Sequence, residues 1–243
     1  MAMLRFSLEQ LSFAYPQGKE IFCQTSFSFT TNQRIGFFGP NGCGKSTLFY
    51  LITGLLQPTQ GRMLFQDKAL LQENDFRILR RNIGLVLQHA DDQLFHPTVL
   101  EDVAFGPLNL GLGPKEAKKR AQETLEQLGL SDLQQRLTHQ LSGGEKRLVA
   151  LAAVLAMRPA ALLLDEPTND LDPLHRHKLI EILNPLPTGW IIISHDLSFL
   201  QETCHEFMSI HNHKLMLSDS LHVHHHLHAH PWGDTPHSHH HIS

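Results

Sequence analysis

Hydrophobic residues in the first thirty positions alternate with polar ones, which is the pattern of strands that bury one face. The alternation is loose over residues 3–13 and returns over residues 22–30, where Phe27 and Phe29 fall on the same face. Between them, residues 15–18 read Tyr-Pro-Gln-Gly and have the composition of a turn. We therefore expect these two strands to lie antiparallel to one another.

Shorter segments that are continuously apolar follow, and they predict buried strands. The runs at residues 161–164 and 190–193 are unbroken, as in parallel strands that are covered on both faces. Further strands are expected at residues 34–38, 61–65 and 83–87, and a last hairpin at residues 207–210 and 215–217.

Apolar residues recur at helical spacing in the middle of the chain. One helix is expected to begin at Pro114 and to end at Gly129, with the basic residues between 115 and 120 on its solvated face. A second helix is expected from Ser142 to just before Pro159. No hydrophobic periodicity remains beyond about residue 220.

These elements suggest one α/β domain over residues 1–220, with a helical subdomain at about residues 90–157. Residues 221–243 form a histidine-rich segment that is expected to be flexible, since it has no pattern from which a core could form. The length of 243 residues and the hydrophobic content of 41% allow a large core in the first of these parts.

Charge and cysteine content narrow the class of protein. A net charge of −4 argues against a nucleic-acid binder, which would normally present a basic face. The three cysteines are too few for a disulfide framework, and the N-terminus lacks the apolar core of a signal peptide, so a reduced cytosolic setting is expected. The longest apolar stretch, residues 148–157, is about half of what a bilayer requires. The chain is thus expected to reach a membrane only through a partner.

Residues 39–47 read Gly-Pro-Asn-Gly-Cys-Gly-Lys-Ser-Thr and contain the pattern G-x-x-x-x-G-K-[ST] of a phosphate-binding loop. Small residues let backbone N–H groups turn toward phosphate oxygens, while Lys45 can reach the β- and γ-phosphates and Ser46 can ligate Mg²⁺. The loop stands between an apolar run and residues 46–52, which suit a helix. This strand–loop–helix context argues against the alternative of a chance glycine-rich turn.

Two carboxylates, Asp165 and Glu166, follow the apolar run at residues 161–164. Ligands of α/β sheets bind beyond the carboxyl ends of the strands. Asp165 is therefore placed to hold Mg²⁺, and Glu166 to orient and deprotonate an attacking water. The alternative is a pair of solvated acids at the end of a strand, which the phosphate-binding loop makes less favourable.

Residues 141–145 read Leu-Ser-Gly-Gly-Glu and are open to two interpretations. Ser142 and Glu145 form a capping box, but two consecutive glycines are costly at the start of a helix and capping alone does not explain them. The glycines would let the backbone approach an anion. The segment resembles the signature motif of ATP-binding cassette (ABC) ATPases.

The other motifs of that family occur in the same order as in its members. Gln88 resembles the glutamine of the Q-loop, residues 169–172 resemble the D-loop, and His195 resembles the switch histidine. Tyr15 stands where an aromatic residue stacks on adenine. The resemblance covers about residues 3–220 and implies an α/β P-loop NTPase with a mainly parallel central sheet, an antiparallel β subdomain and a helical subdomain.

The resemblance also implies an Mg-dependent ATPase in which two copies of the chain face each other head to tail. The catalytic residues would be Lys45, Gln88, Glu166 and His195, and the Mg²⁺ ligands Ser46, Gln88 and Asp165. The residues implied for nucleotide binding are Tyr15, Gly39, Pro40, Asn41, Gly42, Cys43, Gly44, Lys45, Ser46, Thr47, Ser142, Gly143 and Gly144. Two positions depart from the family pattern: Leu148, where Arg is frequent, and Asp170, where many importers have Gly.

Residues 91–111 are similar to the ATPases of energy-coupling-factor importers, which serve vitamins and transition metals. In those proteins this stretch lies near the groove that receives a helix of the membrane partner. The chain resembles cobalt and nickel import ATP-binding proteins of this type. The resemblance implies integral membrane partners, a peripheral location on the cytoplasmic side of the cell membrane, and no nucleic-acid partner.

Thirteen of the 19 histidines fall in the last 39 residues. Neutral imidazole binds Ni²⁺ and Co²⁺, among other transition metals. The candidate ligands in the tail are His222, His224, His225, His226, His228 and His230. A purification tag, a pH-responsive linker and compositional drift are the alternatives, although the interleaved apolar residues argue against a tag. With this tail, nickel or cobalt is the expected cargo.

Two other functions remain open from the sequence. A soluble cassette ATPase that acts on DNA or ribosomes would normally carry two cassettes or large insertions, and the sequence has neither. A metal-storage protein would have no need of the intact set Lys45, Asp165 and Glu166. A vitamin importer would use the same ATPase with a different cargo.

Overall fold

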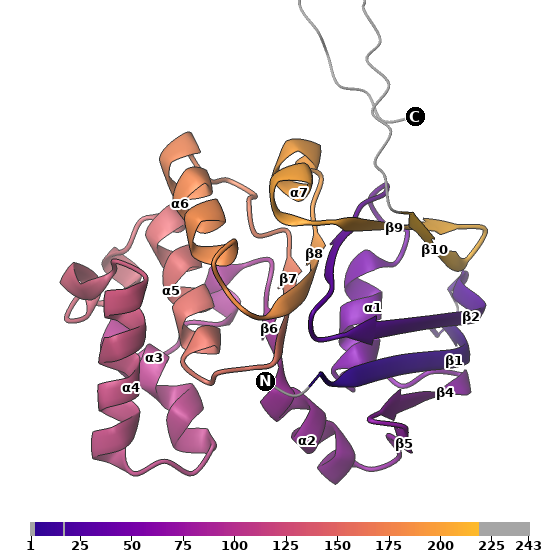
Figure 1. Ribbon diagram of the computed structural model, residues 1–243, viewed down its shortest axis with the longest axis horizontal. Coiled ribbons are helices and arrows are strands. Elements are labelled where there is room, and N and C mark those ends of the chain that lie inside the picture. The colour runs from indigo at the N-terminus through magenta and orange to yellow at the C-terminus, as the bar shows by residue number, and fades with distance from the viewer. Residues whose placement is uncertain (1–2, 17, 219–243) are drawn as a thin grey trace, which may run out of the picture.

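Residues 3–16 and 18–218 are described in the computed structural model of the protein, and they form two sheets surrounded by helices (Figure 1). The smaller sheet lies at the opposite side of the molecule from helices α3, α4 and α5, which span Val99–Asn109, Pro114–Gln127 and Gly143–Leu155. None of the described helices is long and apolar enough to cross a membrane.

The smaller sheet is antiparallel, as the alternating pattern predicts. Its strands, in the order β2-β1-β4-β5, span Glu20–Thr30, Arg5–Ala14, Gln60–Phe65 and Lys68–Ala69. Phe6 pairs with Phe29, and Leu8 with Phe27, and all four side chains are buried. Alternation puts these residues on one face, where they pack as cross-strand pairs.

The larger sheet has the strand order β10-β9-β3-β8-β7-β6, and only β10 is antiparallel to its neighbour. In chain order these strands span Arg34–Phe37 (β3), Ile83–Val86 (β6), Ala161–Asp165 (β7), Gly189–Ile193 (β8), Glu206–His211 (β9) and Lys214–Ser218 (β10). The predicted fold class is confirmed: the central sheet is mainly parallel, and an antiparallel sheet and several helices accompany it.

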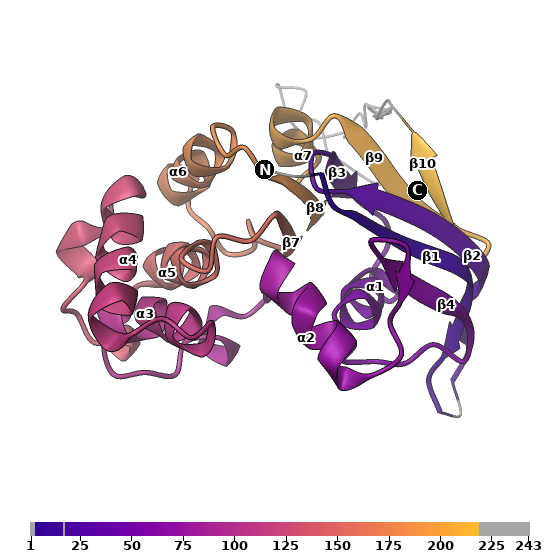
Figure 2. The same cartoon turned by 60° about the horizontal axis from the view of Figure 1, so that its bottom comes forward.

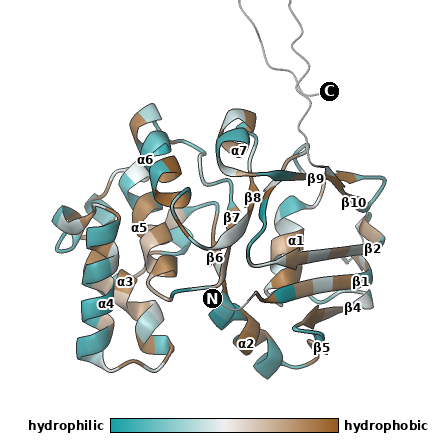
Figure 3. Ribbon diagram, viewed as in Figure 1, coloured by the Kyte–Doolittle hydropathy of each residue, from teal (hydrophilic) through white to brown (hydrophobic). Residues whose placement is uncertain are grey.

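The continuous apolar runs of β7 and β8 are explained by cores on both faces of this sheet. Leu162 and Leu164 belong to the core beneath α5, whereas Leu163 belongs to the core shared with the smaller sheet. Trp190 and Ile191 divide in the same way on β8. Figure 3 shows hydrophobic residues concentrated on these strands and α5, and hydrophilic ones on α4.

Both helices that the spacing predicted in the middle of the chain are present. The helix α4 begins at Pro114, and Gly129 follows its end with a φ of 64° in the left-handed region that favours glycine. The helix α5 is capped by Ser142. Figure 2 shows α3, α4 and α5 gathered on one side of the molecule. The remaining helices are α1 (Lys45–Ile52), α2 (Glu73–Asn82), α6 (Pro173–Leu183) and α7 (Leu197–Thr203), with short 3₁₀ turns at Ala90–Asp92, Ser131–Leu133 and Thr138–Gln140.

Candidate active site

The strand order brings three loops together at the carboxyl edge of the larger sheet. Strand β8 lies between β3 and β7, so the segment that follows β8 is flanked by those that follow β3 and β7. The phosphate-binding loop follows β3, His195 follows β8, and Glu166 follows β7. These segments are far apart in the sequence and become neighbours because their strands are parallel.

A cavity of about 480 Å³ lies at this edge. The residues that line it are Tyr15, Ile21, Asn41, Gly42, Gly44, Lys45, Ser46, Thr47, Gln88, Asp165, Glu166, Asn169, Ile193 and His195. The sequence-predicted catalytic and magnesium-binding residues therefore surround one space. Gly39, Pro40 and Cys43 complete the loop. Ile21 is a lining residue that the motifs did not identify.

The phosphate-binding loop leads directly into α1, and glycines set its path. Gly39, Gly42 and Gly44 have φ values of 146°, 76° and 109°. A Cβ on Gly44 would lie 2.3 Å from Cγ2 of Ile21, so this position has neither the space nor the backbone conformation for a larger residue. No side chain caps the start of α1. The N–H groups of its first turn are thus suited to an anion.

Lys45 is buried, with 7% of its surface exposed. Its Nζ donates to the backbone oxygens of Gly39 at 2.8 Å and Pro40 at 3.0 Å. Both acceptors are neutral carbonyls of the same loop. Because a buried ammonium is stabilised far more by an anion than by neutral oxygens, this arrangement favours binding of phosphate at the loop.

Asp165 presents a buried carboxylate without a full set of partners. It is 3% exposed, and its Oδ1 has no hydrogen-bond partner among residues 3–16 and 18–218. Burial raises the pKa of Asp165, while a hydrogen bond from Ser46 and the charge of Lys45 act in the opposite direction. An orphaned carboxylate oxygen beside a hydroxyl fits a hard cation such as Mg²⁺, which prefers oxygen ligands. Gln88 lines the same cavity.

Glu166 is held at both carboxylate oxygens by one residue. The backbone N–H of His195 donates to Oε2 at 3.3 Å, and Nε2 of the His195 ring lies 3.2 Å from Oε1. The same Nε2 lies 2.8 Å from Oδ1 of Asn41. Burial raises the pKa of Glu166, and burial, followed by the charge of Lys45, lowers the pKa of His195. In a neutral imidazole that carries its hydrogen on Nε2, that hydrogen is donated to Oδ1 of Asn41, and Oε1 of Glu166 lies beside the same nitrogen.

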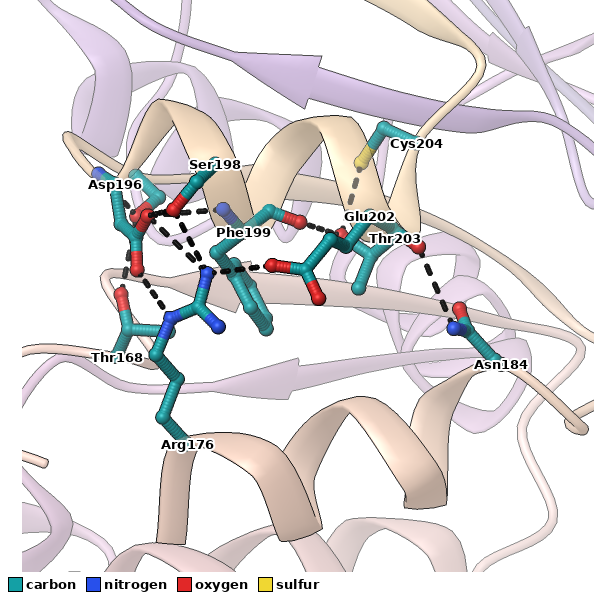
Figure 4. A network of polar contacts seen from close by, with 10 residues as sticks. Thr168, Arg176, Asn184, Asp196, Ser198, Phe199, Glu202, Thr203 and Cys204 are labelled. Atoms are coloured by element: carbon teal, nitrogen blue, oxygen red, sulfur yellow. Dashed lines mark hydrogen bonds and ion pairs between the residues drawn. The ribbon is translucent and has the colours of Figure 1, made fainter. Parts of the chain in front are cut away.

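Neighbouring polar contacts hold the segments that carry Glu166 and His195 together. The hydroxyl groups of Thr168 and Ser194 lie 3.2 Å apart. Arg176 of α6 donates to Asp196 at 2.7 Å and to Glu202 of α7 at 2.9 Å, as Figure 4 shows. These bonds join the segments after β7 and β8, so they restrict the movement of His195.

Tyr15 lies at the rim of the cavity, where it is 40% exposed. Its hydroxyl lies 3.1 Å from Oγ1 of Thr47, and its ring packs edge-to-face on Phe13 with centroids 5.0 Å apart. These two contacts fix the ring plane at the edge of the site. An exposed aromatic ring in a fixed position suits stacking on a planar base.

The structure does not bring Ser142, Gly143 and Gly144 to this cavity. They form the start of α5, where Ser142 and Glu145 make the predicted capping box through bonds of 2.8 and 3.2 Å. Gly143 is exposed, and a Cβ there would meet no described atom within 4 Å. Capping therefore accounts for Ser142 and Glu145, but nothing in the described part of the chain requires glycine at position 143.

The two departures from the family pattern have clear structural settings. Leu148 is buried in the core under α5, and the preceding Arg147 donates to the backbone oxygen of Glu166 at 2.8 Å. Asp170 has a φ of 59°, a conformation that glycine adopts freely and aspartate tolerates.

Across residues 3–16 and 18–218, no group of three or more His, Cys, Asp or Glu side chains is arranged to hold a metal ion. The histidines predicted to bind a transition metal lie outside the described residues; they are His222, His224, His225, His226, His228 and His230.

Comparison with known proteins gives matches to ABC transporters and their ATP-binding proteins. The model of the ABC transporter family matches residues 22–169. The chain is 42% identical over 199 residues to an energy-coupling factor transporter ATP-binding protein of Methanothermobacter thermautotrophicus, covering 80% of this chain and 64% of that protein. It is 48% identical over 179 residues to the cobalt import ATP-binding protein CbiO of Rhodobacter capsulatus, covering 73% and 64%.

Among solved structures, CbiO1 of Clostridium perfringens, part of the ABC transporter complex CbiONQ, superimposes with a TM-score of 0.78. It is 34% identical in sequence, and the match covers 88% of each chain.

Proposed function

Because this chain belongs to the ABC transporter family of ATP-binding proteins, we propose that it is the ATP-hydrolysing subunit of an energy-coupling-factor importer. The observation that carries the proposal is the arrangement of Lys45, Asp165, Glu166 and His195 around one cavity. Lys45 is suited to phosphate, Asp165 to a cation, and Glu166 to the activation of water. The similarity to energy-coupling factor ATPases supports the same assignment.

In this proposal the phosphate-binding loop holds the triphosphate of ATP. Backbone N–H groups within residues 39–47 donate to the phosphate oxygens, although Pro40 has none to offer, and Tyr15 stacks on the adenine. Lys45 exchanges its two carbonyl acceptors for oxygens of the β- and γ-phosphates, where its charge is better compensated.

Ser46, Gln88 and Asp165 would hold Mg²⁺, since all three present oxygen atoms to the cavity. Bound Mg²⁺ supplies positive charge that stabilises the phosphate oxygens during transfer. The orphaned oxygen of Asp165 supports this assignment, because a cation would satisfy it.

Glu166 acts as the base toward the attacking water. Its carboxylate accepts a proton from that water, and its raised pKa makes it a better acceptor than an exposed glutamate. His195 donates its backbone N–H to Oε2 of that carboxylate, and its Nε2 hydrogen, which Asn41 accepts in the absence of nucleotide, would turn to the γ-phosphate. Lys45 and the loop N–H groups stabilise the negative charge that develops on the phosphate.

A second copy of the chain would complete the site. Ser142 and Gly143 are exposed at the N-terminus of α5, away from the cavity of their own chain. Facing a second chain head to tail, they would present backbone N–H groups to its γ-phosphate. One chain carries both sets of motifs, which supports a homodimer with two complete sites.

A groove near residues 91–111 supports docking of a membrane component. It has a volume of about 330 Å³ and is lined largely by apolar residues, among them Leu55, Phe95 and Phe105. Leu55 and Phe95 are 62% and 64% exposed. A helix of an integral membrane subunit with an apolar face would cover them, which would hold this chain as a peripheral subunit at the cytoplasmic side of the cell membrane.

Nickel or cobalt is the proposed cargo. The similarity to a protein named for cobalt import supports a metal substrate, and the imidazoles of residues 222–230 are good ligands for either ion. In this proposal the tail binds Ni²⁺ or Co²⁺ through these side chains.

The test is metal uptake by cells that express the chain with its neighbouring membrane components. Wild type is compared with Glu166→Gln and with a chain that stops at residue 220. Accumulation of nickel or cobalt that is lost in Glu166→Gln would support the proposal, and the truncated chain measures the contribution of the tail. ATP hydrolysis without metal uptake would overturn the metal cargo in favour of a vitamin or another solute. A wild-type chain without ATPase activity would overturn the enzyme assignment.

A further inference from the structure

Arg147 is a cation buried in the apolar part of α5. Only 8% of its surface is exposed, and it precedes the buried residues Leu148 and Val149. Burial of a guanidinium is unfavourable unless hydrogen bonds and opposite charges compensate. Its position therefore calls for a specific partner.

That partner is the segment after β7, which carries Glu166. Nη1 of Arg147 donates to the backbone oxygen of Glu166 at 2.8 Å, and this bond is buried. The charges of Asp170 and Glu166 favour the charged form of the guanidinium, although burial lowers the pKa of Arg147. The cation thus reaches from α5 across to the end of β7.

Glu166 has a backbone that requires support. Its φ is 46°, in the left-handed region, which is unfavourable for a non-glycine residue. Its N–H donates to the backbone oxygen of Ile193 at 2.9 Å. Its own carbonyl accepts from Arg147 at 2.8 Å and from the backbone N–H of Asn169 at 3.2 Å. Both peptide groups that adjoin its Cα are therefore fixed. Without Arg147, the carbonyl of Glu166 keeps only the longer bond from within its own loop and loses its link to α5.

The neighbouring cation on the same helix has a different setting. Lys146 lies at the surface, where its Nζ is 2.6 Å from Oδ1 of Asp91. It makes no bond to the segment after β7 that the structure records. Of these two adjacent cations on α5, Arg147 contacts the site through a buried bond, whereas Lys146 forms an ion pair at the surface. Lys146 is therefore a matched control for Arg147.

We infer that Arg147 is a positioning residue that ties the general base Glu166 to α5. The N-terminus of α5 carries Ser142, Gly143 and Gly144, which face the nucleotide of the second copy in the proposed dimer. Arg147 lies one turn further along the same helix. In the proposed dimer, the nucleotide held by the second copy contacts the start of α5. Through Arg147 this helix is linked to Glu166, which acts on the nucleotide bound by its own chain. The inference rests on the proposed ATPase function.

The experiment measures kcat, KM for ATP and equilibrium ATP binding in the full chain. Arg147→Met keeps the length and apolar stem of the side chain and removes the donor. Its kcat is expected to fall at least about tenfold, because small displacements of a catalytic group cost one to two orders of magnitude in rate. ATP affinity is expected to stay within about twofold of wild type, since Arg147 does not line the cavity. Arg147→Lys should regain part of kcat, and Lys146→Gln should match wild type.

A wild-type kcat in Arg147→Met would overturn the inference. So would a loss of kcat that is matched by loss of ATP binding and is not reversed in Arg147→Lys, because it would indicate a purely structural role. Glu166→Gln separates this result from the proposed function. If wild type hydrolyses ATP and Glu166→Gln does not, the ATPase assignment stands whatever Arg147→Met does.

Discussion

His195 contacts both carboxylate oxygens of Glu166, one through its backbone N–H at 3.3 Å and the other through Nε2 of its ring at 3.2 Å. The contact is possible because β8 lies beside β7 and the two strands end together, with Asp165 paired to Ile193, so that Glu166 and His195 follow at the same edge of the sheet. The glutamate is therefore oriented before substrate arrives. Such preorganisation lowers the reorganisation needed in the transition state.

Replacement of His195 tests this contact. In His195→Ala the carboxylate keeps the backbone bond but loses the ring contact, so kcat is expected to fall at least about tenfold while ATP binding is largely retained. His177→Ala is the matched control, since His177 is 70% exposed on α6 and pairs only with Glu181 among the ion pairs of the described residues. ATPase rates at saturating ATP give the comparison. An undiminished kcat in His195→Ala would contradict the role given to this contact.

The pH dependence of kcat/KM, which reports the groups of the free enzyme, follows from the environment of Glu166. Burial raises its pKa above the ordinary value for glutamate, so the base becomes protonated at a higher pH than an exposed glutamate would. We expect kcat/KM for ATP to fall on acidification while the pH is still above the usual glutamate range. Because burial raises the pKa of Asp165 too, both carboxylates contribute to this loss. A kcat/KM that stays constant down to the ordinary pKa of an exposed carboxylate would contradict a raised pKa.

The same burial predicts that Glu166→Gln is more heat-stable than wild type at neutral pH. The folded pKa of Glu166 is raised, so its contribution to the free energy of unfolding is greatest below the ordinary pKa and declines as the pH rises through the folded pKa. Glutamine does not ionise and avoids this decline. The melting temperature should rise by roughly 2–4 °C for each kcal/mol gained. The difference between the two proteins should shrink at low pH, and a difference of the opposite sign at neutral pH would argue against burial as the cause.

The two glycines at the start of α5 should respond differently to alanine. A Cβ on Gly144 would lie 2.5 Å from Cγ of His175, whose Nδ1 is fixed 2.7 Å from Oδ2 of Asp172. Gly144→Ala is therefore expected to lower the free energy of unfolding by about 1–3 kcal/mol. Adding His175→Ala should restore much of this loss, which a double-mutant cycle measures by thermal or denaturant unfolding.

Gly143→Ala has space within its own chain and should not lower stability. If a second copy places its nucleotide against this backbone, the added methyl group should reduce ATP hydrolysis without changing the melting temperature. Unfolding and ATPase assays on the same preparation separate the two effects. Full activity in Gly143→Ala would argue that no phosphate approaches this position closely.

All described strands except the two-residue β5 were predictable, because their signal is local. Alternation identified the antiparallel pair, and continuous apolar runs identified β7 and β8, whose two faces meet two different cores. The helices α2, α3, α6 and α7 were not predicted one by one. The seven residues of α7 span too few turns for a periodic pattern to be recognised. The start of α6 is marked by Asp172 as its cap and Pro173 at its first position, but Asp172 was interpreted as part of the D-loop and not as a helix cap.

The candidate site residues could be identified from the sequence where they form a contiguous motif, as in the phosphate-binding loop and at Asp165 and Glu166. Ile21 and Arg147 were missed because their roles depend on packing against residues that are distant in the sequence, Gly44 and Glu166. The left-handed backbone conformation of Glu166 could not be predicted either, because glutamate has no preference for that conformation.

The most direct measurement is ATP hydrolysis by the purified full chain with Mg²⁺, set beside Glu166→Gln under the same conditions, with ATP binding measured for both. We expect steady hydrolysis by wild type. Glu166→Gln should bind ATP with similar affinity and hydrolyse it at least about a hundredfold more slowly, because the general base is lost. Equal rates in the two proteins would contradict the assignment of Glu166 as the base.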